Sequence, residues 1–181
     1  MGGGSSLPYD AEIEYLESTG TQWINTGIKL LENATGILRF RCKGLINDGG
    51  SLPTLVNAMK EVRPWPGFCL RIDNRVALIW SSTFYRNWNP NQLFEIDHTH
   101  DLSGQNHDWP LTLFCAMRNL TTPMRQCIGK LYYLRIDIND VMVVDFIPVR
   151  IGTTGYLYDK VSGTLFGNAG TGSFTLGPDK T

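Results

Sequence analysis

The sequence predicts an all-β domain built from antiparallel strands. Short runs of residues alternate between apolar and polar side chains, which is the period-two pattern of a half-buried strand. Turn residues separate these runs, and the 181-residue chain contains 19 glycines and 9 prolines. No segment has the apolar periodicity of a helix of ordinary length.

The first 120 residues are predicted to form strands that are joined by turns and polar loops. The predicted strands are residues 13–17, 22–26, 36–42, 68–72, 75–80, 93–97 and 111–117. Residues 55–59 are ambiguous between a strand and a helical turn. Residues 44–53 and 98–109 are rich in polar side chains and are predicted to be loops.

A central hairpin is predicted to join residues 130–138 to residues 142–150. In the first run, alternation places four side chains on the buried face, namely Tyr132, Leu134, Ile136 and Ile138. In the second run, Pro148 has no N–H to give to a neighbouring strand. The strand is therefore predicted to end at this proline or to border an edge.

The register of this hairpin depends on the length of its turn. A two-residue turn would set Asp145 opposite Leu134 on the apolar face, where an unpaired carboxylate is costly. A three-residue loop of residues 139–141 instead pairs Leu134 with Phe146 and sets Asp145 opposite Arg135 on the outer face. We expect this second register, because it buries no unpaired carboxylate and forms a cross-strand ion pair. In the three-residue loop, Asp140 is expected to adopt the left-handed conformation.

The rest of the chain is predicted to be a meander of short strands. The strands are residues 155–158, 164–166 and 173–176, and the turns between them contain aspartate, asparagine and glycine. Nothing in this meander has the character of a catalytic motif.

Several of these segments carry a resemblance to a known family. At the C-terminal end they are residues 130–138, 145–150, 155–163 and 168–174, and at the N-terminal end residues 14–27, EYLESTGTQWINTG. They resemble the closing and opening signatures of a laminin-G-like, concanavalin A-like jelly-roll module. This module is common in proteins of gut Bacteroidales, their prophages and their phages.

The resemblance implies an antiparallel two-sheet jelly-roll sandwich. The sandwich is expected as a single domain over residues 10–178, after a flexible tail at residues 1–9 that is rich in glycine and serine. Because the first and last strands of jelly rolls commonly lie together, we expect the strand near Tyr15 to pack close to Phe174. The fold implies no single activity, since lectins, adhesion modules, glucanases and spacers all use it.

Composition excludes several classes of function. The formal net charge of −1 gives no electrostatic case for nucleic acid or an anionic membrane as a partner. No apolar run reaches membrane-spanning length, and the first residues lack the features of a signal peptide. The four cysteines are widely spaced, which predicts free thiols and a protein made in a reducing compartment.

A cluster of aromatic, amide and guanidinium side chains is the predicted ligand-binding site. It consists of Trp65, Tyr85, Arg86, Asn87 and Trp88. Sugar rings stack on indole faces, and polar side chains of this kind orient a bound sugar. Two alternatives remain: these aromatic side chains cover the ends of the sandwich, or they form a protein interface.

A second polar cluster contains side chains of the kinds that bind metals or catalyse hydrolysis. Six side chains lie within twelve residues, namely Asp97, His98, His100, Asp101, His107 and Asp108. Their spacing is not a strong metal signature, so a solvated loop without a cofactor is predicted, with calcium as the weaker alternative. A glucanase needs two facing carboxylates, and the candidates, Glu95 and Asp97, have no obvious partner. The chain is therefore predicted not to be an enzyme.

The resemblance and the composition together favour a structural protein of a phage virion. It would be a head decoration, head fibre or tail-associated protein that is assembled in the bacterial host cytoplasm, with mucin or host glycans as candidate ligands. The N-terminal tail would attach it to other virion proteins, and a homotrimer is expected by analogy with phage fibres. The alternative is a carbohydrate-binding adhesin module on a bacterial cell surface, and a glycan-cleaving enzyme comes third.

Overall fold

The chain folds into antiparallel β-sheets. A computed structural model describes residues 6–47, 52–59, 67–73, 76–79, 82–85 and 91–181. Within these ranges there is no helix, and the strands form sheets of nine, six and two strands. The all-β class predicted from the sequence is confirmed.

The nine-stranded sheet, called here the large sheet, carries both ends of the domain. Its strands are β1 (Ala11–Glu12), β2 (Leu16–Thr19), β4 (Ile37–Ile46), β9 (Leu93–Asp101), β13 (Ile128–Ile138), β14 (Val141–Ile151), β15 (Thr154–Asp159), β16 (Thr164–Phe166) and β17 (Thr175–Leu176). The small sheet contains β3 (Ile24–Asn25), β5 (Thr54–Met59), β6 (Gly67–Asp73), β7 (Val76–Ile79), β8 (Ser82–Tyr85) and β10 (Thr112–Leu113). A short hairpin of β11 (Ala116–Met117) and β12 (Pro123–Met124) forms the third sheet.

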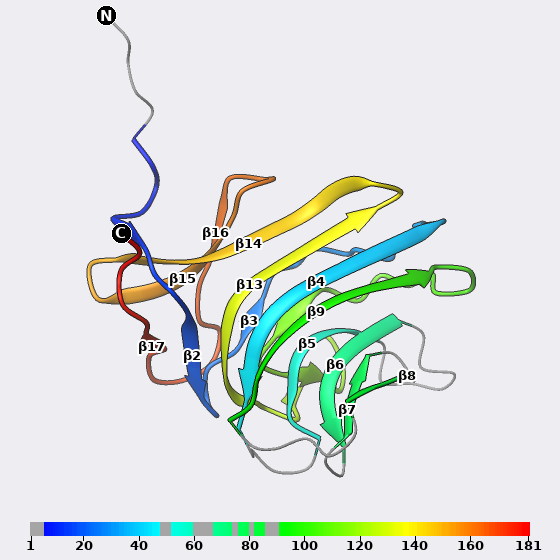
Figure 1. Cartoon of the computed structure of the whole chain (residues 1–181), viewed down its shortest axis with the longest axis horizontal. Helices are drawn as coiled ribbons and strands as arrows, with labels where there is room; N and C mark the ends of the chain where they lie inside the picture. Colours follow the sequence, from blue (N-terminus) through cyan, green and yellow to red (C-terminus); the bar gives the residue numbers. More distant parts are fainter. Residues whose placement is uncertain (1–5, 48–51, 60–66, 74–75, 80–81, 86–90) are drawn as a thin grey trace, which may run out of the picture.

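The large and small sheets face each other across a shared apolar core (Figure 1). Phe40 of β4 and Phe68 of β6 are fully buried, and their ring centroids lie 5.6 Å apart at an edge-on angle. Phe114, which follows β10, contacts Phe174 near the C-terminus at 5.3 Å. Aromatic contacts between the layers therefore join the two sheets into a sandwich.

Strand β13 organises the large sheet. One of its edges pairs with β4, and its other edge pairs first with β2 and then with β14. Since β14 diverges from β13, the N-terminal segment fills the gap between them, with β1 bonded to β14. Pro148 lies at this change of partner, where its carbonyl accepts the Ile13 N–H at 3.0 Å. No N–H is needed there, so β14 continues beyond the proline instead of ending at it.

The predicted register of the β13–β14 hairpin is confirmed away from the turn, but the predicted turn is wrong, and next to it Ile138 pairs with Val141 and not with Met142. Leu134 pairs with Phe146, and Arg135 pairs with Asp145. The turn, however, contains two residues, Asn139 and Asp140, at φ angles of 52° and 62°. An additional residue in β14 forms a bulge, which restores the register that the longer loop was expected to give.

The side chain of Asn139 explains why the shorter turn forms. Both turn positions are left-handed, a conformation that Asn and Asp tolerate better than other non-glycine residues. Asn139 Oδ1 accepts the Ile37 N–H at 3.0 Å, and Asn139 Nδ2 donates to the Thr35 carbonyl at 2.9 Å. The turn is thus fixed to the start of β4.

Tyr132 does not lie on the buried face, contrary to the sequence prediction. The register between β13 and β4 shifts after Leu131, so that Leu131 pairs with Gly44 and Tyr133 pairs with Lys43. Tyr132 is the additional residue of this bulge. Leu131 turns inward in its place, and Tyr132 and Tyr133 are both half-buried on the outer face.

Several element boundaries also differ from those predicted. Strands β4 and β9 extend into the segments expected as loops, and they pair with each other from Ile37 to Leu45. The ambiguous segment around residues 55–59 is a strand. The strand predicted at residues 111–117 is divided by Phe114, whose φ of 62° separates β10 from β11.

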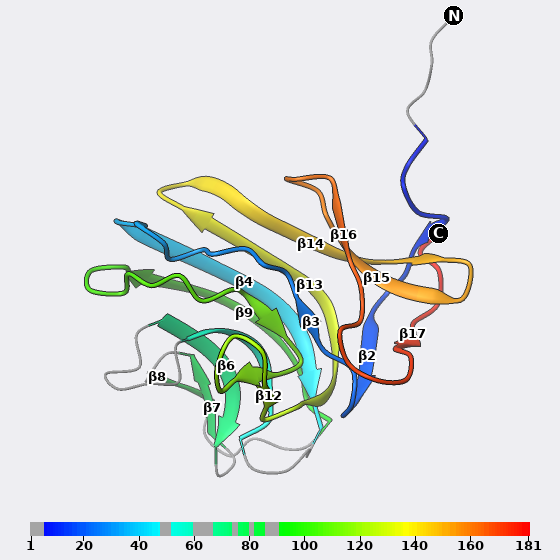
Figure 2. The same ribbon diagram turned by 180° about the vertical axis from the view of Figure 1, so that it is seen from behind.

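Residues 14–27 and 168–174, which carry the family resemblance at the two ends of the domain, contact each other through hydrogen bonds. Gln22 Oε1 accepts the Thr19 N–H at 2.7 Å, and Gln22 Nε2 donates to the Thr171 carbonyl at 3.2 Å. Strand β17 pairs with β2 next to this contact (Figure 2). The expectation that the strand near Tyr15 packs beside the last strand is therefore confirmed.

Candidate functional site

The aromatic cluster predicted as a ligand site cannot be placed. Trp65, Arg86, Asn87 and Trp88 lie outside the described residues, and Tyr85 is placed only as the last residue of β8. That site therefore stays a prediction. Other parts of the chain form the hollows that the structure describes.

A hollow of about 340 Å³ on the outer face of the large sheet is the leading candidate site. It is called here the tyrosine pocket, and it is lined by Glu14, Lys43, Glu95, Tyr132, Tyr133 and Lys180. The β13 bulge creates this pocket, because a regular strand would turn one of the two adjacent tyrosines into the core.

One rung of three neighbouring strands forms a wall of the tyrosine pocket. Lys43 of β4 pairs with Tyr133 on one side and with Glu95 of β9 on the other. The Tyr133 hydroxyl donates to Glu95 Oε1 at 2.7 Å. Burial, together with this hydrogen bond, raises the pKa of Tyr133 to about 12, so its hydroxyl keeps its proton at neutral pH.

A chain of ring and ammonium contacts continues from Tyr132. Its ring centroid lies 5.4 Å from that of Tyr15, and Lys43 Nζ is 5.5 Å from the Tyr132 centroid. Lys130 Nζ lies 4.0 Å from the Tyr15 centroid and 3.8 Å from a carboxylate oxygen of Glu17. These contacts hold both rings against the sheet, since cations are attracted to aromatic faces.

The opposite side of the tyrosine pocket comes from the two ends of the domain. The Glu14 N–H donates to the Pro178 carbonyl at 2.9 Å, and the Lys180 N–H donates to the Glu12 carbonyl at 2.8 Å. Glu14 and Lys180 are therefore placed by the pairing of the terminal segments. The pocket is complete only when both ends of the domain are folded.

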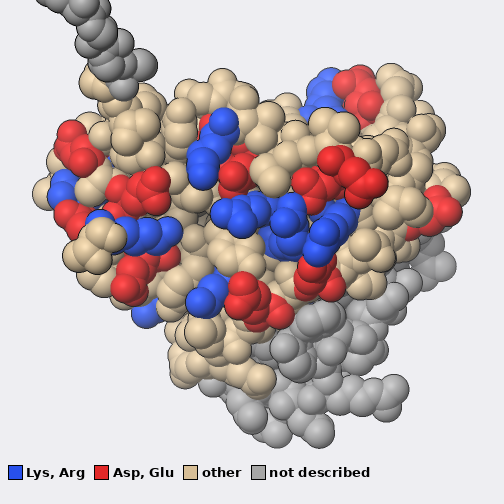
Figure 3. Space-filling model, turned by 45° about the horizontal axis from the view of Figure 1, so that its top comes forward, with Lys and Arg blue, Asp and Glu red and all other residues tan. Residues whose placement is uncertain are grey.

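Acidic and basic side chains alternate over the outer face beyond the tyrosine pocket. Figure 3 shows lysines and arginines gathered there with carboxylates around them. Arg39 donates to both carboxylate oxygens of Asp97, at 2.8 and 2.5 Å, and Arg135 donates to Asp145 at 3.0 Å. A third ion pair joins Arg41 to Asp137. The face is therefore balanced in charge.

The residues of the His/Asp cluster between Asp97 and Asp108 lie in different environments. Asp97, His98, His100 and Asp101 lie in β9, so this part of the predicted loop is a strand. Asp97 is held by Arg39, whereas His107 is buried and its Nδ1 accepts the Trp109 N–H at 3.1 Å. Across the described ranges, no three His, Cys, Asp or Glu side chains are grouped so that they could hold a metal ion.

No disulfide joins the four cysteines in the described part of the chain, and all four side chains are buried. Desolvation raises the pKa of Cys115 to about 12 and that of Cys42 and Cys127 further still. These three thiols are therefore core side chains and poor nucleophiles.

No helix among the described residues is long and apolar enough to cross a membrane.

The chain was compared with protein-family models, curated proteins and solved structures, and no match was found. The tyrosine pocket offers half-exposed aromatic rings for stacking, carboxylates that accept hydrogen bonds, and ammonium and phenol groups that donate them. Sequence reasoning missed this pocket because strict alternation hides the bulge. The only signal was a pair of adjacent tyrosines within a strand.

Proposed function

We propose that the chain is a non-enzymatic binding module that holds a saccharide in the tyrosine pocket. The observation that carries this proposal is the presentation of Tyr132 and Tyr133 side by side in a 340 Å³ hollow. Sugars present apolar C–H faces to aromatic rings and present hydroxyls to carboxylate and ammonium groups. A site with both kinds of surface therefore suits them.

We propose a non-enzymatic module because the surroundings of the two candidate acids, Glu95 and Asp97, do not suit acid catalysis. The hydrogen bond and charge of Arg39 lower the pKa of Asp97, which makes Asp97 a poor proton donor near neutral pH. Glu95 accepts a hydrogen bond from Tyr133, a group that retains its own proton. Glycoside hydrolysis needs one carboxyl group that gives up a proton and a second that acts as nucleophile or base.

The test is binding of the purified chain to an array of mucin glycans and bacterial capsular polysaccharides. We expect selective binding that is lost in Tyr132→Ala and retained in Tyr156→Ala. Tyr156 is a suitable control because it is a half-buried tyrosine of the same sheet that does not line the pocket. A folded protein that binds no glycan, or a Tyr132→Ala variant that binds as well as the parent, would contradict the proposal.

The topology and location are proposed on the resemblance to laminin-G-like jelly-roll modules. We propose a jelly-roll sandwich displayed on a phage virion, held to other virion proteins by the N-terminal tail, with a bacterial cell surface as the alternative. The pairing of the first and last strands supports the jelly-roll type. Mass spectrometry of purified phage particles tests the location: stoichiometric amounts of the chain support virion display, and its absence from particles favours the cell-surface alternative.

A further inference from the structure

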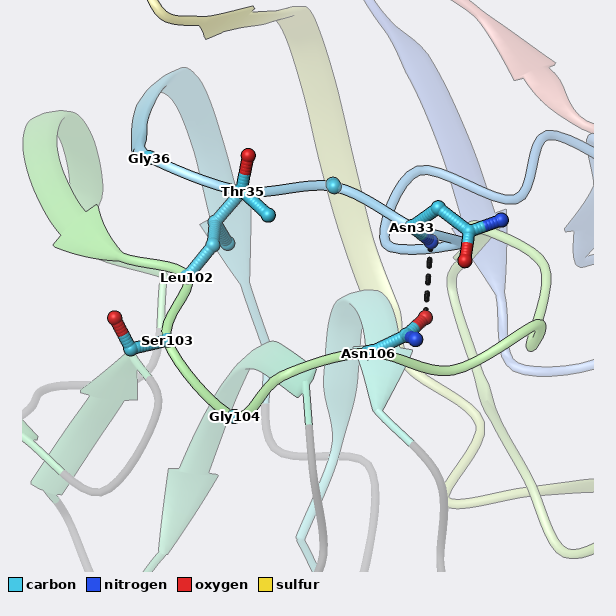
Figure 4. A pocket seen from close by; sticks show the side chains of 8 residues that line it. Asn33, Thr35, Gly36, Leu102, Ser103, Gly104 and Asn106 are labelled. Atoms are coloured by element: carbon cyan, nitrogen blue, oxygen red, sulfur yellow. Dashed lines mark hydrogen bonds between the residues drawn. The ribbon is translucent and has the colours of Figure 1, made fainter.

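A second hollow lies at one end of the sandwich, where two loops meet. One loop precedes β4 and the other follows β9, and the two strands are paired at Ile37 and Asp101. This hollow, called here the rim pocket, has a volume of about 310 Å³ (Figure 4). It is lined by Asn33, Ala34, Thr35, Gly36, Leu102, Ser103, Gly104 and Asn106.

Hydrogen bonds between the two loops hold the rim pocket in shape. The Leu102 N–H donates to the Gly36 carbonyl at 2.8 Å, and the Asn33 N–H donates to Asn106 Oδ1 at 2.9 Å. Asn33 and Gly104 have φ angles of 58° and 76°, which Asn and Gly adopt most readily. The backbone of the two loops is thus held in place before any ligand arrives, and this lowers the entropy lost on binding.

The polar side chains that line the rim pocket are uncharged, and several of their groups make no hydrogen bond within the described chain. Within the described chain, the Asn33 side-chain amide, the Thr35 hydroxyl and Asn106 Nδ2 make no hydrogen bond. In Figure 4 the Thr35 and Ser103 hydroxyls, which come from different loops, both point toward the top of the view. The Ser103 hydroxyl donates to Asp101 at 2.6 Å, which leaves its lone pairs for a ligand donor.

The charge and the size of the rim pocket select the class of ligand. Among the described residues, no Lys, Arg, Asp or Glu lines it, and the neighbouring Asp101 carboxylate already accepts the Ser103 hydroxyl. A neutral ligand therefore suits this pocket better than an ionic one. Leu102 and Ala34 add an apolar surface beside the amides and hydroxyls. A volume of about 310 Å³ is at the small end of ligand pockets, which suits a ligand of one or two rings.

We propose that the rim pocket binds one neutral sugar residue through its hydroxyl groups. The amides and hydroxyls would pair with the sugar hydroxyls, and Leu102 and Ala34 would contact a C–H face. None of these residues lines the tyrosine pocket, so this second site stands independently of the proposed function. The chain would then hold a glycan at two places, which strengthens attachment when both sites are filled together.

The test uses the full ¹⁵N-labelled chain and NMR titration with methyl glycosides of glucose, galactose and mannose and with N-acetylglucosamine. We expect at least one sugar to shift the amide signals of residues 33–36 and 102–106 in a saturable manner. Thr35→Val removes a hydroxyl and keeps the shape of the side chain. It should weaken that binding about threefold to tenfold, as expected for one lost hydrogen bond.

The matched control is Thr99→Val, since Thr99 is also exposed and lies in β9 away from the rim pocket. It should leave the affinity unchanged, as should Tyr132→Ala. The proposal is overturned if no sugar in the panel shifts these amide signals at millimolar concentration. It is also overturned if Thr35→Val binds as well as the parent, or if the shifts lie only around the tyrosine pocket. This last result would leave the proposed function standing.

Discussion

Neighbouring groups shift the pKa values of side chains on the outer face, and Tyr133 shows the clearest shift. Its folded-state pKa of about 12 lies above the ordinary value of 10, so the folded protein retains the proton more tightly than the unfolded chain. The stability that this group contributes is fully present below pH 10 and is lost as the pH rises through 12. Denaturant unfolding measured between pH 9 and 12 should therefore show a decline in stability that is smaller in Tyr133→Phe.

Glu95 provides a direct test of the cause of this shift. Burial is its largest cause, and the hydrogen bond to Glu95 comes second. Replacing Glu95 by Gln removes the negative charge, so the pKa of Tyr133 should fall to a value between 10 and 12. Ultraviolet titration of tyrosine, with Tyr133→Phe subtracted, measures this directly. An unchanged titration in Glu95→Gln would mean that burial alone sets the pKa.

Gly170 is required by space and not by its backbone angles. A Cβ at this position would lie 2.0 Å from the Thr21 carbonyl oxygen and 2.7 Å from the indole of Trp23. Gly170→Ala should therefore lower the free energy of unfolding by about 2–3 kcal/mol, as overpacking does elsewhere. Gly167→Ala is the matched control, because its Cβ would meet only the Tyr156 ring, at 3.2 Å. In Gly167→Ala the free energy of unfolding, measured for both variants by denaturant unfolding, should fall by less than about 1 kcal/mol. Equal losses in the two variants would contradict the steric argument.

At the scale of the element, the β13–β14 hairpin depends on Asn139. This residue adopts a left-handed conformation and bonds to both Thr35 and Ile37. Asn139→Ala loses these hydrogen bonds and leaves a strained backbone, so the free energy of unfolding should fall by about 2–3 kcal/mol. Asp140→Gly keeps the turn geometry, since glycine accepts positive φ, and should change stability by less than about 1 kcal/mol. A larger loss in Asp140→Gly than in Asn139→Ala would count against this reasoning.

The elements also show what sequence patterns can and cannot predict. Leu134, Ile136 and Phe146 were placed correctly, because alternation over a long amphipathic run leaves a single face to bury. Tyr132 was misplaced, because a bulge adds one residue without changing the composition of the strand. The tyrosine pocket depends on that bulge and on residues from both ends of the domain, and these are long-range pairings that no local pattern encodes.

At the scale of the whole molecule, the two signature segments meet and close the sandwich. Gln22 and Thr21 from the first segment bond to Thr171 from the last, about 150 residues later in the chain. These contacts of the segments that carry the family resemblance stabilise the fold, and three other residues of the same segments, Glu14, Tyr132 and Tyr133, line the tyrosine pocket. The other three lining residues, Lys43, Glu95 and Lys180, lie outside these segments, so the pocket combines both kinds of position.

The buried thiols offer a measure of how cooperatively this closed structure opens. Cys42, Cys69, Cys115 and Cys127 are each at most 1% exposed and are spread over both sheets and the segments that connect them. Burial raises the pKa of Cys115 to about 12, so the thiolate fraction of the native state is very small at neutral pH. We expect all four thiols to react with DTNB at one common rate, which is set by global unfolding.

Gln22→Ala removes the hydrogen bond to the Thr171 carbonyl and should increase the rates of the four reactions equally. Early reaction of Cys127 alone, whose strand neighbour β13 pairs with β2, would instead show that the terminal strands detach before the core opens.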